Sequence, residues 1–272
     1  MIAAALLLAL AADPAPAAGE PPPAPRGGAP AAIPCTLPTL APGDRPWRTG
    51  ETLTFDLDVL GMVKAGTLQI SIERPMSGGK VIPLRARART DAAVANVKKF
   101  AGVALSWIDA ETLLPERYRD ETEEDGVRKV SDARLLPAQE ELTIETRYGD
   151  RTGKTSYPRE RPVLDALSTL TYLRAAKLAP GERFCFDLVA NRRFWRLEGQ
   201  VAARTEKVDT PAGRFDTFRV DASTRRVDRP GDRPRPIHLW FTKDGRRLLV
   251  AVVSEVDLGP VRAILSGVRG AR

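Results

Sequence analysis

The sequence predicts a mainly β protein, in which an antiparallel sheet curves into a barrel or half-barrel and one or two helices pack against it. Two observations lead to this prediction. From Trp47 onwards, apolar residues recur at every second position in consecutive short segments, which is the spacing of strands that bury one face. Turn motifs such as Asp125-Gly126 separate these segments, as is typical of hairpins. Because a run of adjacent strands leaves open edges, curling the sheet is the economical arrangement.

Residues 1–46 have a different composition, with eleven of the 23 prolines and no aromatic residue. The apolar run over residues 2–12 and the small residues around its end are typical of a secretory signal, although no Lys or Arg precedes the run. We therefore predict a signal peptide over residues 1–18, a Pro/Ala-rich linker over residues 19–46 and a single β-rich domain over residues 47–272. The apolar run is too short for a membrane-spanning helix, so we expect no transmembrane segment in the mature chain.

Export would place the two cysteines in an oxidising compartment, where thiols pair. Cys35 lies in the predicted linker, and Cys185 lies in a strand-like stretch of the domain. We expect these two residues to form a disulfide that ties the linker to the domain. The alternative, a lipid-modified Cys35, is disfavoured because Ile33-Pro34 precedes it and the apolar run is far away.

The first two strands follow from alternation of apolar and polar residues. This pattern predicts strands over residues 53–59 and 68–72. Gly61 and Gly66 are expected to bracket the turn between them, because glycine adopts the backbone dihedrals that turns require.

The third predicted strand, over residues 84–88, carries a row of arginines on its polar face. Arg85, Arg87 and Arg89 alternate with apolar residues and form the most regular cationic feature of the chain. The favoured interpretation is a solvent face whose arginines pair with acids on a neighbouring strand. An anion-binding stripe is the alternative.

Further segments show the same alternation and predict the remaining strands, with a hairpin turn at Asp125-Gly126. These segments are residues 103–109, 117–124, 127–135, 142–148, 183–190, 194–204, 214–223, 237–242 and 247–256.

Two segments have helical spacing instead. Residues 92–101 predict a short helix, and residues 164–178 predict a longer one. For the longer helix, Asp165 is the expected N-cap, and Pro180-Gly181 is expected to end it. Leu167, Leu170 and Leu178 are expected to form its apolar stripe.

Charge and residue types limit the chemistry. The net charge of +7 favours anionic partners, although a solvated basic surface explains it as well. With one histidine, two cysteines and no glycine-rich phosphate loop, we predict no catalytic residue, no metal site and no cofactor. His238, the single histidine, is interpreted as structural. The strands lack an ordered ladder of basic and aromatic residues, so we expect no nucleic-acid partner.

Carboxylate chemistry is the enzymatic alternative, because pairs of acids hydrolyse glycosides. Acidic residues cluster over residues 121–125 and again at Glu140 and Glu141. Both clusters lie at a predicted hairpin tip or strand start, where acids keep an edge soluble. Catalytic use is therefore the less favoured interpretation.

Short motifs of the chain occur in the order found in one bacterial family. They are ETLTFD (51–56) with Gly61 and KAG (64–66), DALS (165–168) with YLR (172–174), TPAGRF (210–215), and LWF (239–241) with Asp244 and Arg247. On these motifs the chain resembles, over about residues 47–267, the exported family catalogued as domain of unknown function 3108. The resemblance implies an exported cell-envelope protein of mostly antiparallel strands, in the periplasm or at the cell surface. It implies no established activity, cofactor or catalytic residue.

Three functional hypotheses follow. The favoured one is non-enzymatic binding of an envelope lipid or polysaccharide inside or along the curved sheet. In one form of it, the helix and the sheet enclose a cleft in which Tyr172, Arg174 and Trp240 meet an amphipathic ligand. Alternatively, Tyr172 and Arg174 anchor the helix to the sheet, Arg174 through a buried carboxylate. The second hypothesis is a carboxylate-dependent hydrolase of envelope polymer, and the third is a structural or assembly partner with an apolar patch or an uncovered edge strand.

Overall fold

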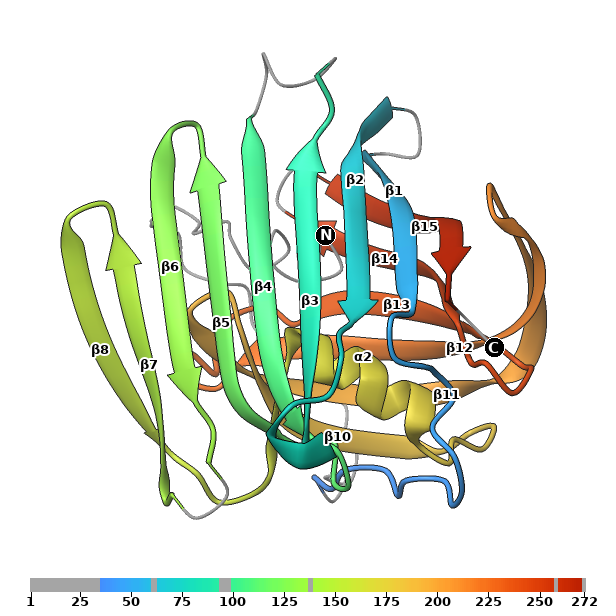
Figure 1. The fold of residues 1–272 in the computed structure, drawn as a ribbon, viewed down its shortest axis with the longest axis horizontal. Helices are drawn as coiled ribbons and strands as arrows, with labels where there is room; N and C mark the ends of the chain where they lie inside the picture. Colours follow the sequence, from blue (N-terminus) through green and yellow to red (C-terminus); the bar gives the residue numbers. More distant parts are fainter. Residues whose placement is uncertain (1–34, 60–62, 93–98, 137–138, 257–258, 271–272) are drawn as a thin grey trace, which may run out of the picture.

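The computed structural model describes residues 35–59, 63–92, 99–136, 139–256 and 259–270, and its strands form one curved sheet (Figure 1). The first half of the chain supplies strands β1 (Thr52–Val59), β2 (Val63–Ile72), β3 (Val81–Thr90), β4 (Phe100–Asp109), β5 (Pro115–Glu124), β6 (Val127–Arg134), β7 (Glu141–Tyr148) and β8 (Arg151–Pro158), with a 3-10 turn η1 (Ser77–Gly79) between β2 and β3. The second half supplies β9 (Val163–Asp165), helix α2 (Ala166–Ala175), β10 (Arg183–Ala190), β11 (Arg193–Thr210), β12 (Gly213–Arg226), β13 (Arg235–Thr242), β14 (Leu249–Val256) and β15 (Gly259–Arg269).

The order across this 15-stranded sheet is β8-β7-β6-β5-β4-β3-β2-β1-β15-β14-β13-β12-β11-β10-β9. Its pairs are antiparallel, except that β9 and β10 run parallel. The first and last strands, β1 and β15, pair in the middle of the sheet. The two edges are therefore β8 and β9.

The sheet folds back on itself around helix α2. In Figure 1, β1–β8 form the front layer, β10–β15 run across behind them, and α2 lies between the layers. All ten residues of α2 are buried, and the helix contacts β3, β4, β9 and β10. Strand β9 also contacts β5, so β6–β8 extend beyond the place where the sheet meets itself. The predicted mainly β fold, a curved antiparallel sheet with a packed helix, is confirmed.

Helix α2 begins as the sequence predicted but is shorter. Asp165 is its N-cap: its carboxylate accepts hydrogen bonds from the backbone N–H groups of Leu167 and Ser168, while Ser168 Oγ accepts one from the Asp165 N–H. The helix ends at Ala175, not near residue 178. Ala176 is extended and pairs with Leu40, so the chain leaves the helix to meet another segment.

The segment over residues 35–46 packs on the domain. A disulfide joins Cys35 to Cys185 in β10, as predicted. Backbone hydrogen bonds of 2.8 Å run from the Lys177 N–H to the Thr39 carbonyl and from the Ala41 N–H to the Ala175 carbonyl. The segment therefore crosses the C-terminal end of α2 and is held there by covalent and hydrogen bonds. Residues 1–34, which include the predicted signal peptide, lie outside the described residues.

Some predicted elements differ from the structure. Gly66 does not lie in a turn but inside β2, where a Cβ atom would lie 2.2 Å from the Arg89 carbonyl oxygen. A close approach of two backbones, rather than an unusual dihedral angle, is what requires glycine there.

Of the predicted helix over residues 92–101, residues 93–98 lie outside the described residues, and Phe100 begins β4. The predicted hairpin turn is confirmed: Asp125 and Gly126 have φ values of 50° and 81°.

Candidate functional site

Tyr172 and Arg174, two of the three predicted ligand-binding residues, lie on α2 and are buried. Tyr172 Oη donates to the Pro38 carbonyl at 3.0 Å. The Arg174 guanidinium donates to Glu51 Oε1 at 2.6 Å and to the carbonyl of Arg247 at 2.9 Å. These contacts fix the helix to the chain on either side of it, so both residues anchor α2, Arg174 through a buried carboxylate.

Trp240, the third predicted residue, lies elsewhere. Along β13 it alternates with Leu239 and Phe241, which are buried in the core, so its side chain is on the other face of the strand. Its indole N–H donates to Glu206 at 2.8 Å, and Arg219 lies over its ring. The structure therefore does not bring Trp240 together with Tyr172 and Arg174. Whether any of the three residues binds a ligand stays a prediction.

His238 shares this outward face with Trp240. Its Nδ1 lies 2.5 Å from Asp221 Oδ1, and Arg219 Nε also lies 2.8 Å from that oxygen. The group is a surface network of paired charges. The described residues contain no cluster of three or more His, Cys, Asp or Glu side chains placed to hold a metal ion.

Two carboxylates, Asp120 and Asp165, are buried between the layers and face inward. Asp165 is fully engaged: besides capping α2, it accepts a hydrogen bond from Ser106 of β4 at 2.6 Å. Burial raises the pKa of Asp165 to about 6. The hydrogen bonds that Asp165 accepts lower its pKa, but the effect of burial is larger. Because all its contacts hold the helix and join it to β4, Asp165 has a structural role.

Asp120 of β5 is different, because its carboxylate is less firmly held: the hydroxyl groups of Tyr118 and Ser131 lie beside it and lower its pKa, but in looser geometry than the hydrogen bonds to Asp165. Burial raises the pKa of Asp120 to about 7, although the charge of Arg192 opposes the rise. Tyr118, Thr122 and Ser131 bring further buried hydroxyl groups to the same inner face of β5 and β6. Asp120 thus lies in a polar strip inside a protein whose core is otherwise mainly apolar.

The first predicted acid cluster lies at the β5–β6 hairpin, where two of its acids pair with cations. The second, Glu140 and Glu141, lies at the start of β7 and has no ion pair among the described residues. Glu121 pairs with Arg128 at 2.7 Å, and Glu124 pairs with Lys129 at 2.6 Å across the β5–β6 hairpin. The hydrolase hypothesis needs two acids in one cleft. The inward acids Glu51, Asp120 and Asp165 are all buried, and Glu51 is paired with Arg174.

The arginine row of β3 is only partly paired. Arg85 lies 3.2 Å from Glu73, as the sequence predicted for the row. Arg87 instead lies between Gln69 and Val103, and within the described part of the chain it has no ion pair. Arg89 likewise lies between Thr67 and Ala101 and has no ion pair with a described residue. The predicted pairing with acids is therefore correct for Arg85 alone.

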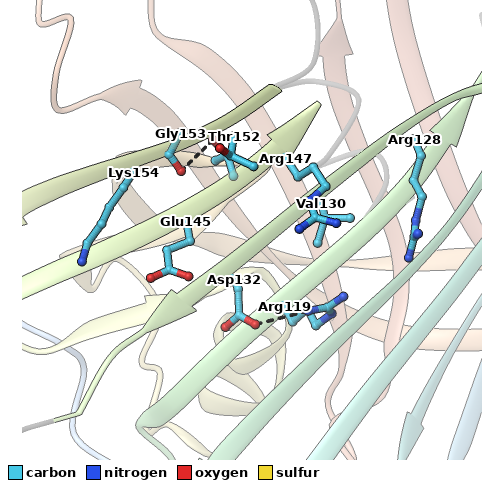
Figure 2. Close-up of a pocket in the computed structure, with 10 residues that line it drawn as sticks. Arg119, Arg128, Val130, Asp132, Glu145, Arg147, Thr152, Gly153 and Lys154 are labelled. Atoms are coloured by element: carbon cyan, nitrogen blue, oxygen red, sulfur yellow. Dashed lines mark hydrogen bonds and ion pairs between the residues drawn. The ribbon is translucent and has the colours of Figure 1, made fainter. Parts of the chain in front are cut away.

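The outer face of β5–β8 contains a charged hollow of about 520 Å3, opposite the polar strip (Figure 2). Alternate residues of four neighbouring strands bring their side chains to this face because side chains in a strand point to opposite sides in turn. Its charged residues are Arg119, Arg128, Asp132, Glu145, Arg147 and Lys154.

Cations exceed acids in this hollow, and two of them are unpaired. Arg119 lies 3.4 Å from Asp132, and Arg128 is occupied by its pair with Glu121. Burial would raise the pKa of Asp132, but hydrogen bonds from Arg117 and Arg119 bring it below its usual value, so Asp132 is ionised at neutral pH. By contrast, Arg147 and Lys154 form no ion pair or side-chain hydrogen bond with any described residue. The hollow therefore presents two unpaired cations to solvent, together with one acid, Glu145, that lies opposite Lys154 and also has no ion pair among the described residues. Sequence reasoning missed it, because the pattern is visible only once β7 and β8 are known to be paired.

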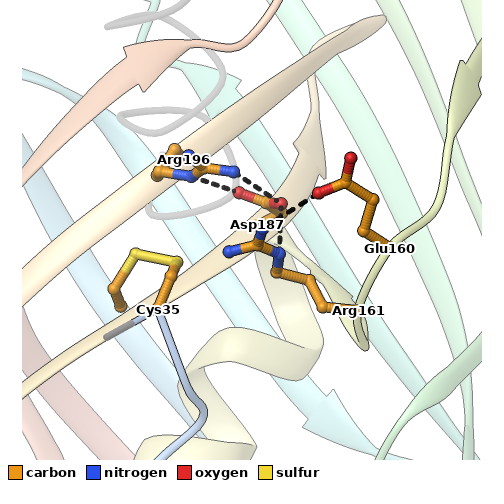
Figure 3. Close-up of a disulfide and its surroundings, with 6 residues drawn as sticks. Cys35, Glu160, Arg161, Asp187 and Arg196 are labelled. Atoms are coloured by element: carbon orange, nitrogen blue, oxygen red, sulfur yellow. Dashed lines mark hydrogen bonds and ion pairs between the residues drawn. A yellow bond between two sulfur atoms is a disulfide. The ribbon is translucent and has the colours of Figure 1, made fainter. Parts of the chain in front are cut away.

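The disulfide lies next to a third charged group. Figure 3 shows Asp187 of β10 between Arg196 and Arg161, at 2.8 and 3.6 Å. Cys35 and Cys185 join the N-terminal segment to β10 two residues away from Asp187. Because Asp187 is paired on both sides, this group stabilises the strand and leaves no free charge.

Comparison with solved structures defines the class of the fold. The chain is similar to a β-barrel-like protein of domain of unknown function DUF1849 from Brucella abortus, with a TM-score of 0.55 and 10% identity over 87% of this chain and 100% of that one. Weaker similarity links it to a Bacteroides fragilis protein described as exported, with a YmcC-like fold (TM-score 0.31, 13% identity, 86% of this chain and 100% of that one). A Parabacteroides distasonis protein described as a lipoprotein is similar at a TM-score of 0.34 and 10% identity, over 87% and 100% of the two chains. The first of these similarities shows that the curled sheet of this chain shares its fold with a β-barrel-like protein.

Within that class the family is defined by sequence. Residues 54–266 match the family described as protein of unknown function (DUF3108), so the chain belongs to this family, as its motifs predicted. Among curated proteins no relative matches the chain. No helix of the described residues has the length and apolar character needed to cross a bilayer.

Proposed function

We propose that this protein is exported to the periplasm or cell surface, where it binds an anionic polysaccharide of the cell envelope without transforming it. The observation that carries the proposal is the outer hollow of β5–β8, with Arg147 and Lys154 free to meet carboxylate or phosphate groups. The net charge of +7 adds a general attraction for such a polymer. The Cys35–Cys185 disulfide supports an oxidising compartment outside the cytoplasm, and the apolar run over residues 2–12 supports export.

A polysaccharide suits the hollow better than a lipid does. The hollow is open and lined by charged side chains from four strands, which can follow a polymer along the surface. An acyl chain gains its binding energy from burial against apolar surface, and the hollow's side chains are mainly charged and polar.

The test is titration with polygalacturonate, an anionic polysaccharide, and with dextran, a neutral one. We expect polygalacturonate to bind at low ionic strength and dextran not to bind. Substituting both Arg147→Ala and Lys154→Ala should weaken binding at least tenfold, because both unpaired charges of the hollow are lost. Unchanged polymer length after long incubation is expected for a binder without hydrolase activity.

The matched control removes the same charge elsewhere. Arg183 and Arg204 are exposed, lie on β10 and β11, and form no ion pair among the described residues. The Arg183→Ala/Arg204→Ala protein should keep most of its affinity, losing only the effect of net charge. Equal weakening in both double variants would mean that binding is a general effect of charge, and the hollow would not be the site.

A further inference from the structure

Strand β8 is an uncovered edge of the sheet. Among the described residues it pairs with β7 alone, and it ends the sheet order (Figure 1). Residues 151–156 are all exposed. The other edge, β9, is different: its three residues are buried, and the strand contacts β5. The fold therefore covers one of its two edges and leaves the other open.

The hydrogen-bonding groups of this open edge can be identified. A two-residue turn joins Tyr148 to Arg151, which makes these residues a hydrogen-bonded pair, and such pairs recur at every second residue. The same alternation continues past the strand, where the Arg159 N–H donates to the Glu140 carbonyl at 2.7 Å. Odd-numbered residues of β8 thus bond to β7. The N–H and C=O groups of Thr152, Lys154 and Ser156 point to the open side.

The positive charge of β8 determines which kind of strand can pair with its open edge. Strand β8 contains Arg151 and Lys154 and no acidic residue, and neither cation has an ion pair within the described residues. A second copy of the chain would be a poor partner, because the antiparallel register that uses all three open residues places Lys154 opposite Lys154. An acidic strand would instead meet both cations. Pro158 ends the edge, so the added strand would be short.

We propose that the β8 edge accepts an extended, acidic segment of a partner protein as an added antiparallel strand. Such a segment would form about six backbone hydrogen bonds with Thr152, Lys154 and Ser156. Acidic side chains opposite Arg151 and Lys154 would add charge pairing across the strands. This interaction goes beyond polysaccharide binding and does not depend on it, because its main contacts are with the backbone of the edge and it shares only the Lys154 side chain with the charged residues of the hollow.

The experiment uses a blocked octapeptide that alternates threonine and glutamate, so that its glutamates share one face of the added strand and can meet Lys154. A threonine–lysine octapeptide is its control. Titrations of the full chain are followed by NMR at low ionic strength. We expect the acidic peptide to bind and to slow amide hydrogen exchange at Thr152, Lys154 and Ser156, while the basic peptide does not bind. Thr152→Pro removes one outward N–H without removing a bond to β7, so it should weaken peptide binding about fivefold or more.

Lys154→Glu provides a second variant that keeps the backbone intact. It should weaken the acidic peptide at least tenfold and allow the basic peptide to bind. Ser156→Pro removes another outward N–H at a residue outside the hollow, so it should weaken peptide binding and leave polygalacturonate binding unchanged, which separates this proposal from that of the hollow. Binding of both peptides alike, or acidic-peptide binding that Thr152→Pro leaves unaltered, would refute the proposal. A dimer that Thr152→Pro dissociates would also refute it, because the edge would then pair with a second copy.

Discussion

The guanidinium of Arg174 lies 2.6 Å from the carboxylate of Glu51, and the two side chains are 3% and 1% exposed. The pair joins helix α2 to the chain just before β1. Arg174 also lies over the ring of Trp47, 5.5 Å from its centroid, and donates to the Arg246 carbonyl at 2.9 Å. Arg174 therefore connects the helix to the segment before β1 and to the turn between β13 and β14.

This ion pair predicts a strong dependence of stability on both partners. Arg174→Met leaves the Glu51 carboxylate buried without its cation, so we expect the free energy of unfolding to fall by about 3–5 kcal/mol. The Glu51→Leu/Arg174→Met protein should lose less than the sum of the single variants, because no uncompensated charge remains. Urea unfolding of the four proteins measures this coupling. Additive losses would show that the two side chains act independently.

Asp120 predicts a pH dependence of stability. Its pKa is about 7 in the folded protein and about 4 in an unfolded chain, so the folded state binds the proton more tightly. The protonated Asp120 carboxyl therefore favours the folded state. This contribution to the free energy of unfolding is fully present below about pH 4 and is lost as the pH rises to about 7, and the loss is at most about 4 kcal/mol. Asp120→Asn should remove this loss, which urea unfolding at pH 5 and pH 8 would reveal.

The control for Asp120 is Glu123→Gln, which changes an exposed acid on the opposite face of the same strand. This variant should keep the pH dependence of the unaltered protein. If Asp120→Asn and the unaltered protein lose the same stability between pH 5 and pH 8, Asp120 is ionised throughout that range.

The disulfide predicts that the N-terminal segment is released on reduction. Cys35 and Cys185 are 150 residues apart in sequence, so their bond restricts the unfolded chain strongly. We expect Cys35→Ser/Cys185→Ser to lower the free energy of unfolding by about 2–5 kcal/mol. Hydrogen exchange at the Ala41 and Lys177 amides should become faster, because their bonds join the segment to the end of α2. Reductant should reproduce both effects in the unaltered protein and change nothing in the variant.

Local patterns predicted much of this fold. Alternation predicted most strands because most of them bury one face, and Asp165 was recognisable as an N-cap from its position before an apolar run. Strand β8 was missed because its residues are exposed on both faces and so do not alternate. Strand β9 was missed because three buried residues are too few to show a period. The apolar stripe predicted for α2 has no counterpart, since every residue of that helix is buried.

The candidate site was harder to predict for a similar reason. Asp120 lies in a stretch of β5 that is polar or charged at every position from Arg119 to Glu124, and only the fold shows which of these residues face inward. The hollow depends on Arg147 and Lys154, which come from two strands whose pairing the sequence did not predict. Trp240 is as apolar as its neighbours, and its outward position follows from the register of β13 alone.

The close approach of β2 and β3 at Gly66 predicts that any larger residue at this position destabilises the sheet. Gly66 lies in β2 opposite Thr90 of β3, and an added Cβ would lie 2.2 Å from the Arg89 carbonyl oxygen. That oxygen belongs to the backbone of a paired strand, so it cannot move aside as the end of a flexible side chain can. We expect Gly66→Ala to lower the free energy of unfolding by about 1–3 kcal/mol or more, measured by urea unfolding. Gly231→Ala is the control, since a Cβ there meets no atom within 4 Å, and it should change stability by less than about 0.5 kcal/mol. Equal stability of the two variants would mean that β2 and β3 can separate at this point without cost, which would contradict the close approach of their backbones.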